Sequence, residues 1–178
     1  MLRKISEDYI VNVLKNHEQL TVNCQQELLN IFKNKDEVGM IESASMTRKE
    51  ADGSAPTNAL VDLQNVLEIY FKLSEEWEKS VQANIRFLLE TQETIYRIMA
   101  CYNNLPINFR YILEQLYIKN TSFKEGMFYL TNKLDRSRAS ILRFRKEALN
   151  NIKKMYDSNM SNLELYNQMI KDGKDKYR

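Results

Sequence analysis

The chain has 178 residues and 43% of them are apolar, so it can bury the core of one medium or two small domains. Only four Gly and two Pro leave few turn-formers, which disfavours a many-stranded protein and favours long helices. The formal charge of +2 says little about partners, and no apolar run approaches the roughly 20 residues of a membrane span. We expect an all-α protein that is cytoplasmic, has no membrane association and keeps Cys24 and Cys101 as buried thiols.

The first predicted helix covers residues 6–32 of an N-terminal region, residues 1–34. Ser6 is the candidate N-cap. His17 is the only histidine, and no Ser, Cys and carboxylate arrangement accompanies it, so we interpret it as a packing residue rather than a general base. Apolar residues recur at alternating steps of three and four, as one helix face requires: Ile10, Val13, Leu14, Leu20, Cys24, Leu28 and Ile31.

The next segment, residues 35–58, has no hydrophobic period. It contains Gly39, Gly53 and Pro56 and many small polar side chains. This composition predicts a flexible loop between two helices.

Residues 59–104 carry the longest helical signal. The helix could be continuous or broken, with Ser74 and residues 90–94 as the candidate break points. A helix this long cannot bury its apolar face on itself, so its partner is the N-terminal helix folded back as a hairpin, the same helix of a second protomer in a homodimer, or both. The predicted oligomer or helix-packing seam comprises Leu67, Tyr70, Trp77, Val81, Leu88 and Ile95.

Residues 105–156 predict a compact three-helix module. Pro106 ends the preceding helix and suits the first turn of the next, which runs to Tyr117 or Ile118. Thr121 or Ser122 can cap a second helix that ends at Leu134, and Gly126 is an unfavourable residue inside it. A turn over residues 135–137, with Asp135 or Ser137 as cap, leads to a third helix from Arg138 to about Tyr156. The tail, residues 157–178, has a weak apolar spacing at Leu163, Tyr166, Met169 and Ile170.

The third helix of the module separates two faces. Ile141, Phe144, Ala148 and Ile152 are predicted to point inwards onto Leu130 and Leu134. Arg and Asn can each bond a base bidentately in the major groove, and small residues let a helix approach it. The predicted base-reading face therefore comprises Ser137, Ala139, Ser140, Arg143, Lys146 and Asn150, and the predicted phosphate contacts are Lys133, Arg136, Arg138 and Arg145, with Lys124 as a further candidate.

Charge is concentrated in the same region. Residues 133–154 contain eight cations and two anions, a net charge of +6, so the rest of the chain carries −4. Such a local concentration is typical of a nucleic-acid-binding element, although a solvated basic helix face is the simpler alternative.

The pattern LPxxFRYILxxxY at residues 105–117, with LxxS at 134–137 and ILRFRKEAL at 141–149, resembles region four of bacterial sigma factors. The whole layout is most similar to phage late transcriptional activators of the ArpU and RinA type. The resemblance implies a C-terminal helix-turn-helix that reads promoter DNA and recruits RNA polymerase to late or packaging genes in a bacterial host cell.

The sequence shows no catalytic constellation, no metal-ligand cluster and no phosphate-binding glycine loop, so we expect neither an enzyme nor a cofactor. We expect a sequence-specific transcriptional regulator whose partners are double-stranded DNA, bacterial RNA polymerase and a regulatory protein. Two alternatives remain open at this stage. One is a DNA-packaging component like a phage small terminase subunit, and the other is a helical adaptor that binds protein.

Overall fold

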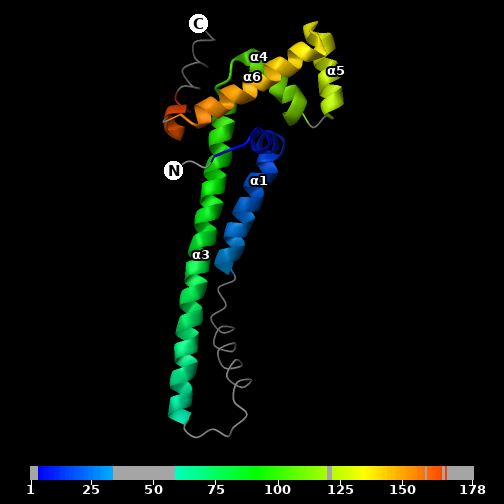
Figure 1. Cartoon of the computed structure of the whole chain (residues 1–178). Helices are drawn as coiled ribbons and strands as arrows, with labels where there is room; N and C mark the ends of the chain where they lie inside the picture. Colours follow the sequence, from blue (N-terminus) through cyan, green and yellow to red (C-terminus); the bar gives the residue numbers. More distant parts are fainter. Residues whose placement is uncertain (1–3, 34–58, 120–121, 159, 166, 168–178) are drawn as a thin grey trace. The chain divides into compact units, whose positions relative to one another are not determined.

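The computed structural model describes residues 4–33, 59–119, 122–158, 160–165 and 167, without the side chains of Phe32 and of residues 59–66. The regular structure in these ranges is helical, which confirms the all-α prediction (Figure 1). The loop predicted at residues 35–58 lies outside them. The elements are α1 (Glu7–Lys33), α3 (Ala59–Asn103), α4 (Ile107–Leu113), the π-helix η1 (Glu114–Ile118), α5 (Phe123–Leu134) and α6 (Arg138–Tyr156).

The chain divides into two compact units. One, called here the core unit, comprises residues 1–23 and 91–178, and the other, the arm unit, comprises residues 24–90. Both α1 and α3 contribute to both units. This division differs from the predicted boundary at Leu105, because the ends of the two long helices belong with the C-terminal helices.

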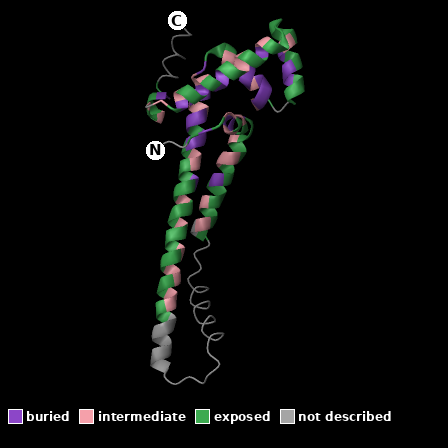
Figure 2. Cartoon of the chain, in the orientation of Figure 1, coloured by how far each residue is buried: buried purple, intermediate pink, exposed green. Residues whose placement is uncertain are grey.

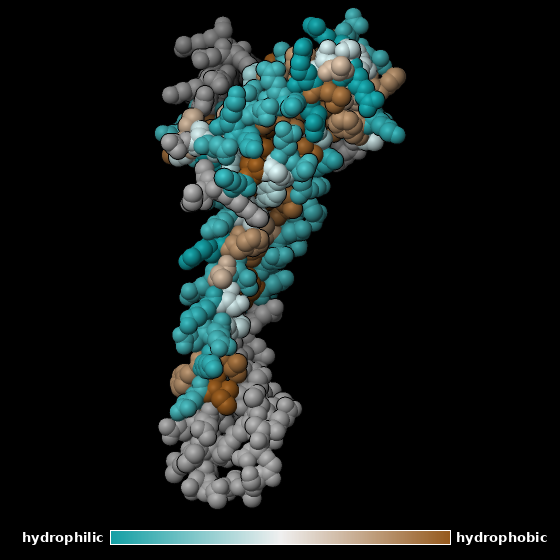
Figure 3. Space-filling model, in the orientation of Figure 1, coloured by the Kyte–Doolittle hydropathy of each residue, from teal (hydrophilic) through white to brown (hydrophobic). Residues whose placement is uncertain are grey.

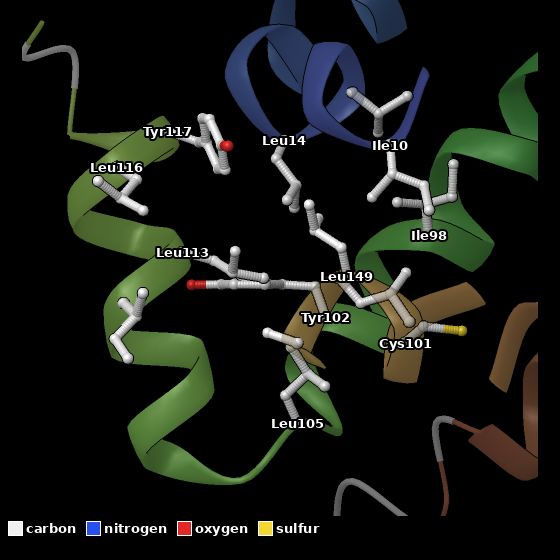
Figure 4. Close-up of a cluster of buried hydrophobic side chains, with 14 of the residues drawn as sticks. Ile10, Leu14, Ile98, Cys101, Tyr102, Leu105, Leu113, Leu116, Tyr117 and Leu149 are labelled. Carbon is white, nitrogen blue, oxygen red and sulfur yellow. The ribbon is translucent and has the colours of Figure 1, made fainter. Parts of the chain in front are cut away.

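The core unit contains one continuous cluster of buried side chains. Four parts of the chain supply it: Ile10 and Leu14 from α1, Ile98 and Cys101 from α3, Leu113 and Leu116 from α4 and η1, and Leu149 from α6. Figure 4 shows these side chains converging on one space. Helices α5 and α6 extend the cluster through Met127, Leu130 and Ile141. Since burial of apolar surface is the main favourable term in folding, this cluster holds the C-terminal helices in place.

Helix α1 follows its sequence signals closely. The Ser6 side chain accepts a hydrogen bond from the Tyr9 N–H at 3.1 Å, as an N-cap should, and Ile10, Val13 and Leu14 are buried. The helix is kinked at Asn16, whose φ and ψ are −127° and 17°. His17, next to the kink, is half-buried, and the Thr21 hydroxyl donates to its backbone carbonyl.

Helix α3 is continuous from Ala59 to Asn103, so neither Ser74 nor residues 90–94 break it. Two residues of the predicted seam, Leu88 and Ile95, are buried, whereas Leu67 is 45% exposed. In the arm unit, Trp77, Val81 and Leu88 line a groove of about 510 Å³ together with Ile31 of α1. The arm is therefore at least partly a hairpin of α1 and α3. No helix in the described part of the chain combines the length and apolarity that a membrane crossing demands.

Candidate nucleic-acid interface

Three short helices build the candidate site, and their boundaries match the sequence signals. Leu105 is buried and Pro106 directly precedes α4. Ser122 caps α5 through a capping box: its hydroxyl accepts from the Glu125 N–H at 3.3 Å, and its own N–H donates to the Glu125 carboxylate at 3.0 Å. That backbone N–H lowers the pKa of the Glu125 carboxyl. Of the two predicted caps, Ser122 is the one used.

The first helix of the module does not remain an α-helix to its end. Residues Glu114–Ile118 form a π-helix, in which the Lys119 N–H donates to the Glu114 carbonyl at 3.1 Å. The buried backbone of Gln115 lies directly against Gly126 of α5, where an added Cβ would be 2.6 Å from the Gln115 oxygen. Gly126 therefore permits close packing of α5 on η1, which explains a glycine at a position where helix propensity disfavours it.

A three-residue turn joins α5 to α6. Asp135 adopts the left-handed conformation with a φ of 47°, and its N–H donates to the Thr131 carbonyl. Asp tolerates this conformation better than most residues with a side chain. Ser137 then caps α6: its hydroxyl accepts from the Ser140 N–H at 3.2 Å and lies 3.0 Å from the Ser140 hydroxyl. The turn and cap fix the start of α6, but they also occupy two hydroxyls that were predicted to read bases.

Helix α6 presents the predicted polar face to solvent. Ala139, Arg143, Lys146 and Asn150 are exposed at steps of three and four, and Ser140 is half-buried. The opposite face is buried through Ile141, Ala148 and Ile152, as predicted. The sequence reasoning missed Leu149 and Tyr156, which are also fully buried and widen the packed face.

Two of the residues predicted to lie in the packed interior of the module are only partly buried. Phe144 is half-buried and Leu134 is 37% exposed, because both line an open hollow of about 390 Å³ between α4 and the start of the α5–α6 turn. The ring of Phe144 instead meets Phe109 of α4, at a centroid distance of 6.3 Å. Leu130 is completely buried as expected.

The predicted phosphate-contacting residues fall into two groups. Lys133, Arg136 and Arg138 are exposed beside the α5–α6 turn, and Lys124 is exposed near the start of α5. Arg145 differs from the prediction because it is half-buried. It follows Ile141 by four residues and precedes Ala148 by three, so it belongs to the packed face of α6.

Arg145 packs on Tyr117 of η1. Its Nε donates to the Tyr117 hydroxyl, and its guanidinium carbon lies 5.6 Å from the ring centroid. Lys15 of α1 lies at the same distance from that ring. Burial raises the pKa of Tyr117, while Arg145 opposes that shift. Tyr117 thus links α1, η1 and α6.

Arg97 of α3 is a positioning residue that the sequence reasoning missed. Its side chain is only 3% exposed and holds the chain that follows α6. Nε donates to the Tyr156 carbonyl at 3.0 Å, and the two terminal nitrogens donate to the carbonyls of Met160 at 2.7 Å and Ser158 at 2.9 Å and to the Asn162 side chain at 2.9 Å. Since Thr94, Arg97 and Cys101 share the buried face of α3, a cation at helical spacing within an apolar face was the available signal.

The tail docks by a different residue from the one predicted. Leu163 is 67% exposed, whereas Leu165 is fully buried and its carbonyl accepts a hydrogen bond from Asn104 at 2.7 Å. The other residues of the predicted spacing, Tyr166, Met169 and Ile170, lie outside the described residues. Within the described ranges, no cluster of three His, Cys, Asp or Glu side chains could hold a metal ion.

Comparison with protein-family models, curated proteins and solved structures gives no match. The interpretation of this site therefore depends on its own geometry. That geometry consists of an exposed face of small, cationic and amide side chains on α6, flanked by cations at a tight turn and supported from behind by a dense core.

Proposed function

We propose that the chain is a sequence-specific DNA-binding transcriptional regulator in which α6 enters the major groove of double-stranded DNA. The observation that carries this proposal is the exposed row Ala139, Arg143, Lys146 and Asn150 on a helix whose other face is packed. Arg143 would bond guanine, Asn150 would bond adenine, and Ala139 leaves room for close approach.

The surroundings of α6 support the same function. Helix α5 precedes it across a three-residue turn, the connection that helix-turn-helix motifs use, in which the second helix reads bases and the first crosses the backbone. Lys133, Arg136 and Arg138 project at that turn and would anchor phosphates on either side of the groove.

The resemblance to sigma region four and to phage late activators adds a proposed context. In that context the chain acts with bacterial RNA polymerase to activate late or packaging genes of a phage or prophage. The arm helices would then provide the surface for a homodimer or for a regulatory protein. A solution mass corresponding to a ring of eight or more subunits would instead favour a role in DNA packaging.

The test is selection of binding sites from a random duplex library, followed by affinity measurements with Arg143→Ala. We expect this variant to lose about 1–3 kcal/mol on the selected site and much less on random DNA, because a bidentate base contact discriminates by that amount. Arg86→Ala, which removes an exposed arginine of the arm unit, is the matched control and should change neither affinity.

Lys133→Ala should weaken binding to both DNAs and reduce the salt dependence by about one phosphate contact. Equal losses for Arg143→Ala on selected and random DNA would demote Arg143 to a phosphate contact. Failure of the wild-type chain to enrich any site at moderate salt would contradict the proposed function itself.

A further inference from the structure

The start of α5 carries a hollow whose aromatic residues the proposed reading of duplex DNA does not use. It has a volume of about 360 Å³ and is called here the α5 hollow. Apolar residues interrupt the hydrophilic surface at the end of the core unit that contains α5 (Figure 3). The residues that line the α5 hollow are Phe123, Lys124, Met127, Phe128, Thr131 and Arg138.

Aromatic exposure is the unusual property of this hollow. Phe128 is 71% exposed, the largest value among the exposed hydrophobic side chains of the described residues. Folding of the core unit does not account for its side chain, since the neighbouring Met127 and Leu130 make the buried contacts of α5. Phe123 is fixed at the edge of the hollow by Tyr117, with ring centroids 6.2 Å apart and planes inclined by 32°.

The charge of the hollow selects among classes of occupant. Lys124 and Arg138 line it and are exposed, and none of its described lining residues carries a carboxylate. Glu125 is turned back to the Ser122 backbone in the capping box. An exposed aromatic side chain that shares a hollow with two cations matches a strand of nucleic acid, whose phosphates pair with the cations while a base stacks on the ring.

We propose that the α5 hollow binds an unpaired base of DNA, with Phe128 as the stacking platform and Lys124 and Arg138 holding the flanking phosphates. A paired base is an unsuitable occupant because the grooves of a duplex expose base edges, whereas stacking requires the face of a base. The proposal rests on the DNA-binding function proposed above. It adds that the chain recognises locally opened DNA next to the duplex that α6 reads.

The test compares two labelled DNAs of equal length, one fully paired and one with a central bubble of a few unpaired thymidines, by fluorescence anisotropy. The wild-type chain should bind the bubble DNA more tightly. Phe128→Ala should weaken bubble binding by roughly 5-fold to 150-fold, the loss expected for one base–aromatic stack, and change duplex binding less than about twofold. Phe128→Trp should retain the preference for the bubble.

The control is Leu163→Ala, because Leu163 is also a large apolar residue in a helical turn, is 67% exposed and is not among the residues that line the hollow. It should change neither affinity. Circular dichroism should show native melting for both alanine variants, since neither removes a buried side chain.

Three results would overturn the proposal. Equal losses on paired and bubble DNA would make Phe128 part of the duplex-reading surface. No loss on either DNA would remove it from DNA binding. Conversion of an oligomer to a monomer by Phe128→Ala, with both affinities unchanged, would assign the hollow to a second copy of the chain. Arg143→Ala tests the proposed function separately, because it addresses the selected duplex site and leaves the bubble preference intact.

Discussion

The two units bury their apolar residues to very different extents, although both consist of amphipathic helices. Among the described residues, the fully or nearly buried apolar side chains belong to the core unit except for Cys24 and Leu88. The arm unit keeps Leu67, Phe71, Phe87 and Leu89 between 45% and 65% exposed. Figure 2 shows the same contrast in colour, with purple gathered in the core unit.

The contrast teaches that a hydrophobic period predicts a helix face but not what covers it. The spacing on α3 is similar before and after Thr91, yet among the described residues only the later part meets helices from several directions. In the arm unit the described part of α3 packs on one side, through Trp77, Val81 and Leu88. An exposed apolar face on the arm is consistent with the homodimer proposed above.

Truncating one leucine in each unit is the strongest test of this difference in burial. Leu149→Ala removes a fully buried side chain at the centre of the core unit and should lower the free energy of unfolding by about 2–5 kcal/mol. Leu67→Ala, at a 45% exposed position of the arm, should lower it by about 0.5 kcal/mol or less. Urea unfolding monitored by circular dichroism gives both values.

If Leu67→Ala proves as costly as Leu149→Ala and the cost depends on protein concentration, the arm is buried in an oligomer. In that case the two units would differ in burial only in the isolated chain, and the oligomer would cover the apolar face of the arm. Similar small effects from both variants would contradict the packed core described here.

Thiol reactivity compares the units without a substitution. Burial raises the pKa of Cys101, in the core unit, from 9.0 to about 11, so its thiolate fraction near pH 8 is about a hundredfold below that of an ordinary thiol. Burial also raises the pKa of Cys24 in the arm unit, and the negative charge of Glu27 adds a smaller increase. We expect Cys24 to react with a disulfide reagent well before Cys101, and mass spectrometry of the labelled peptides identifies the order.

The raised pKa of Cys101 also makes the stability of the folded chain depend on pH. As pH rises, the Cys101 thiol ionises in the unfolded chain before it ionises in the folded chain. The stabilisation from the protonated thiol is therefore complete below about pH 9 and is lost as pH approaches about 11.

In the labelling experiment, equal rates at the two cysteines would show that the core unit opens as readily as the arm.

The smallest expected effect comes from one alanine substitution on a helix of each unit. Gly126→Ala places a Cβ 2.6 Å from a backbone oxygen of η1, so overpacking of about 1–3 kcal/mol competes with about 1 kcal/mol gained in helix propensity. We expect a net destabilisation of about 1 kcal/mol. Ser80→Ala, at an exposed arm position, should be neutral or slightly stabilising, and thermal melts would resolve the two.

Most helix boundaries could be predicted because local residues determine them. Ser6, Ser122 and Ser137 cap helices as their sequence contexts indicate, and Pro106 and Asp135 lie where helices stop. The polar face of α6 followed from periodicity alone. The π-helix at Glu114–Ile118 and the docking of Leu165 depend on contacts between distant segments, which a local pattern does not contain.

Arg145 and Arg97 illustrate the limit for the candidate site. Both are cations: a predicted place on the flank of the base-reading face assigned Arg145 to phosphates, and Arg97 was given no role. Their positions on buried helix faces direct Arg145 to Tyr117 and Arg97 to the carbonyls after α6. The spacing of Arg145 from Ile141 and Ala148 could have placed it on the buried face of α6. The partners of Arg97 could not be predicted in this way, because they lie 59 or more residues away.

The hydrogen bonds of Arg97 limit how far the chain can be shortened if the core unit is to stay intact. Helices α4, α5 and α6 lie in a stretch of chain closed by the hydrogen bonds from Arg97 to Tyr156, Ser158, Met160 and Asn162. A fragment that starts at Leu105, where the sequence motif begins, would omit Arg97 and also the buried Ile10, Leu14 and Ile98. An excised fragment that keeps the proposed DNA-binding helices therefore needs both the first half of α1 and the chain from Thr91 through Leu165, joined by a linker that replaces the arm.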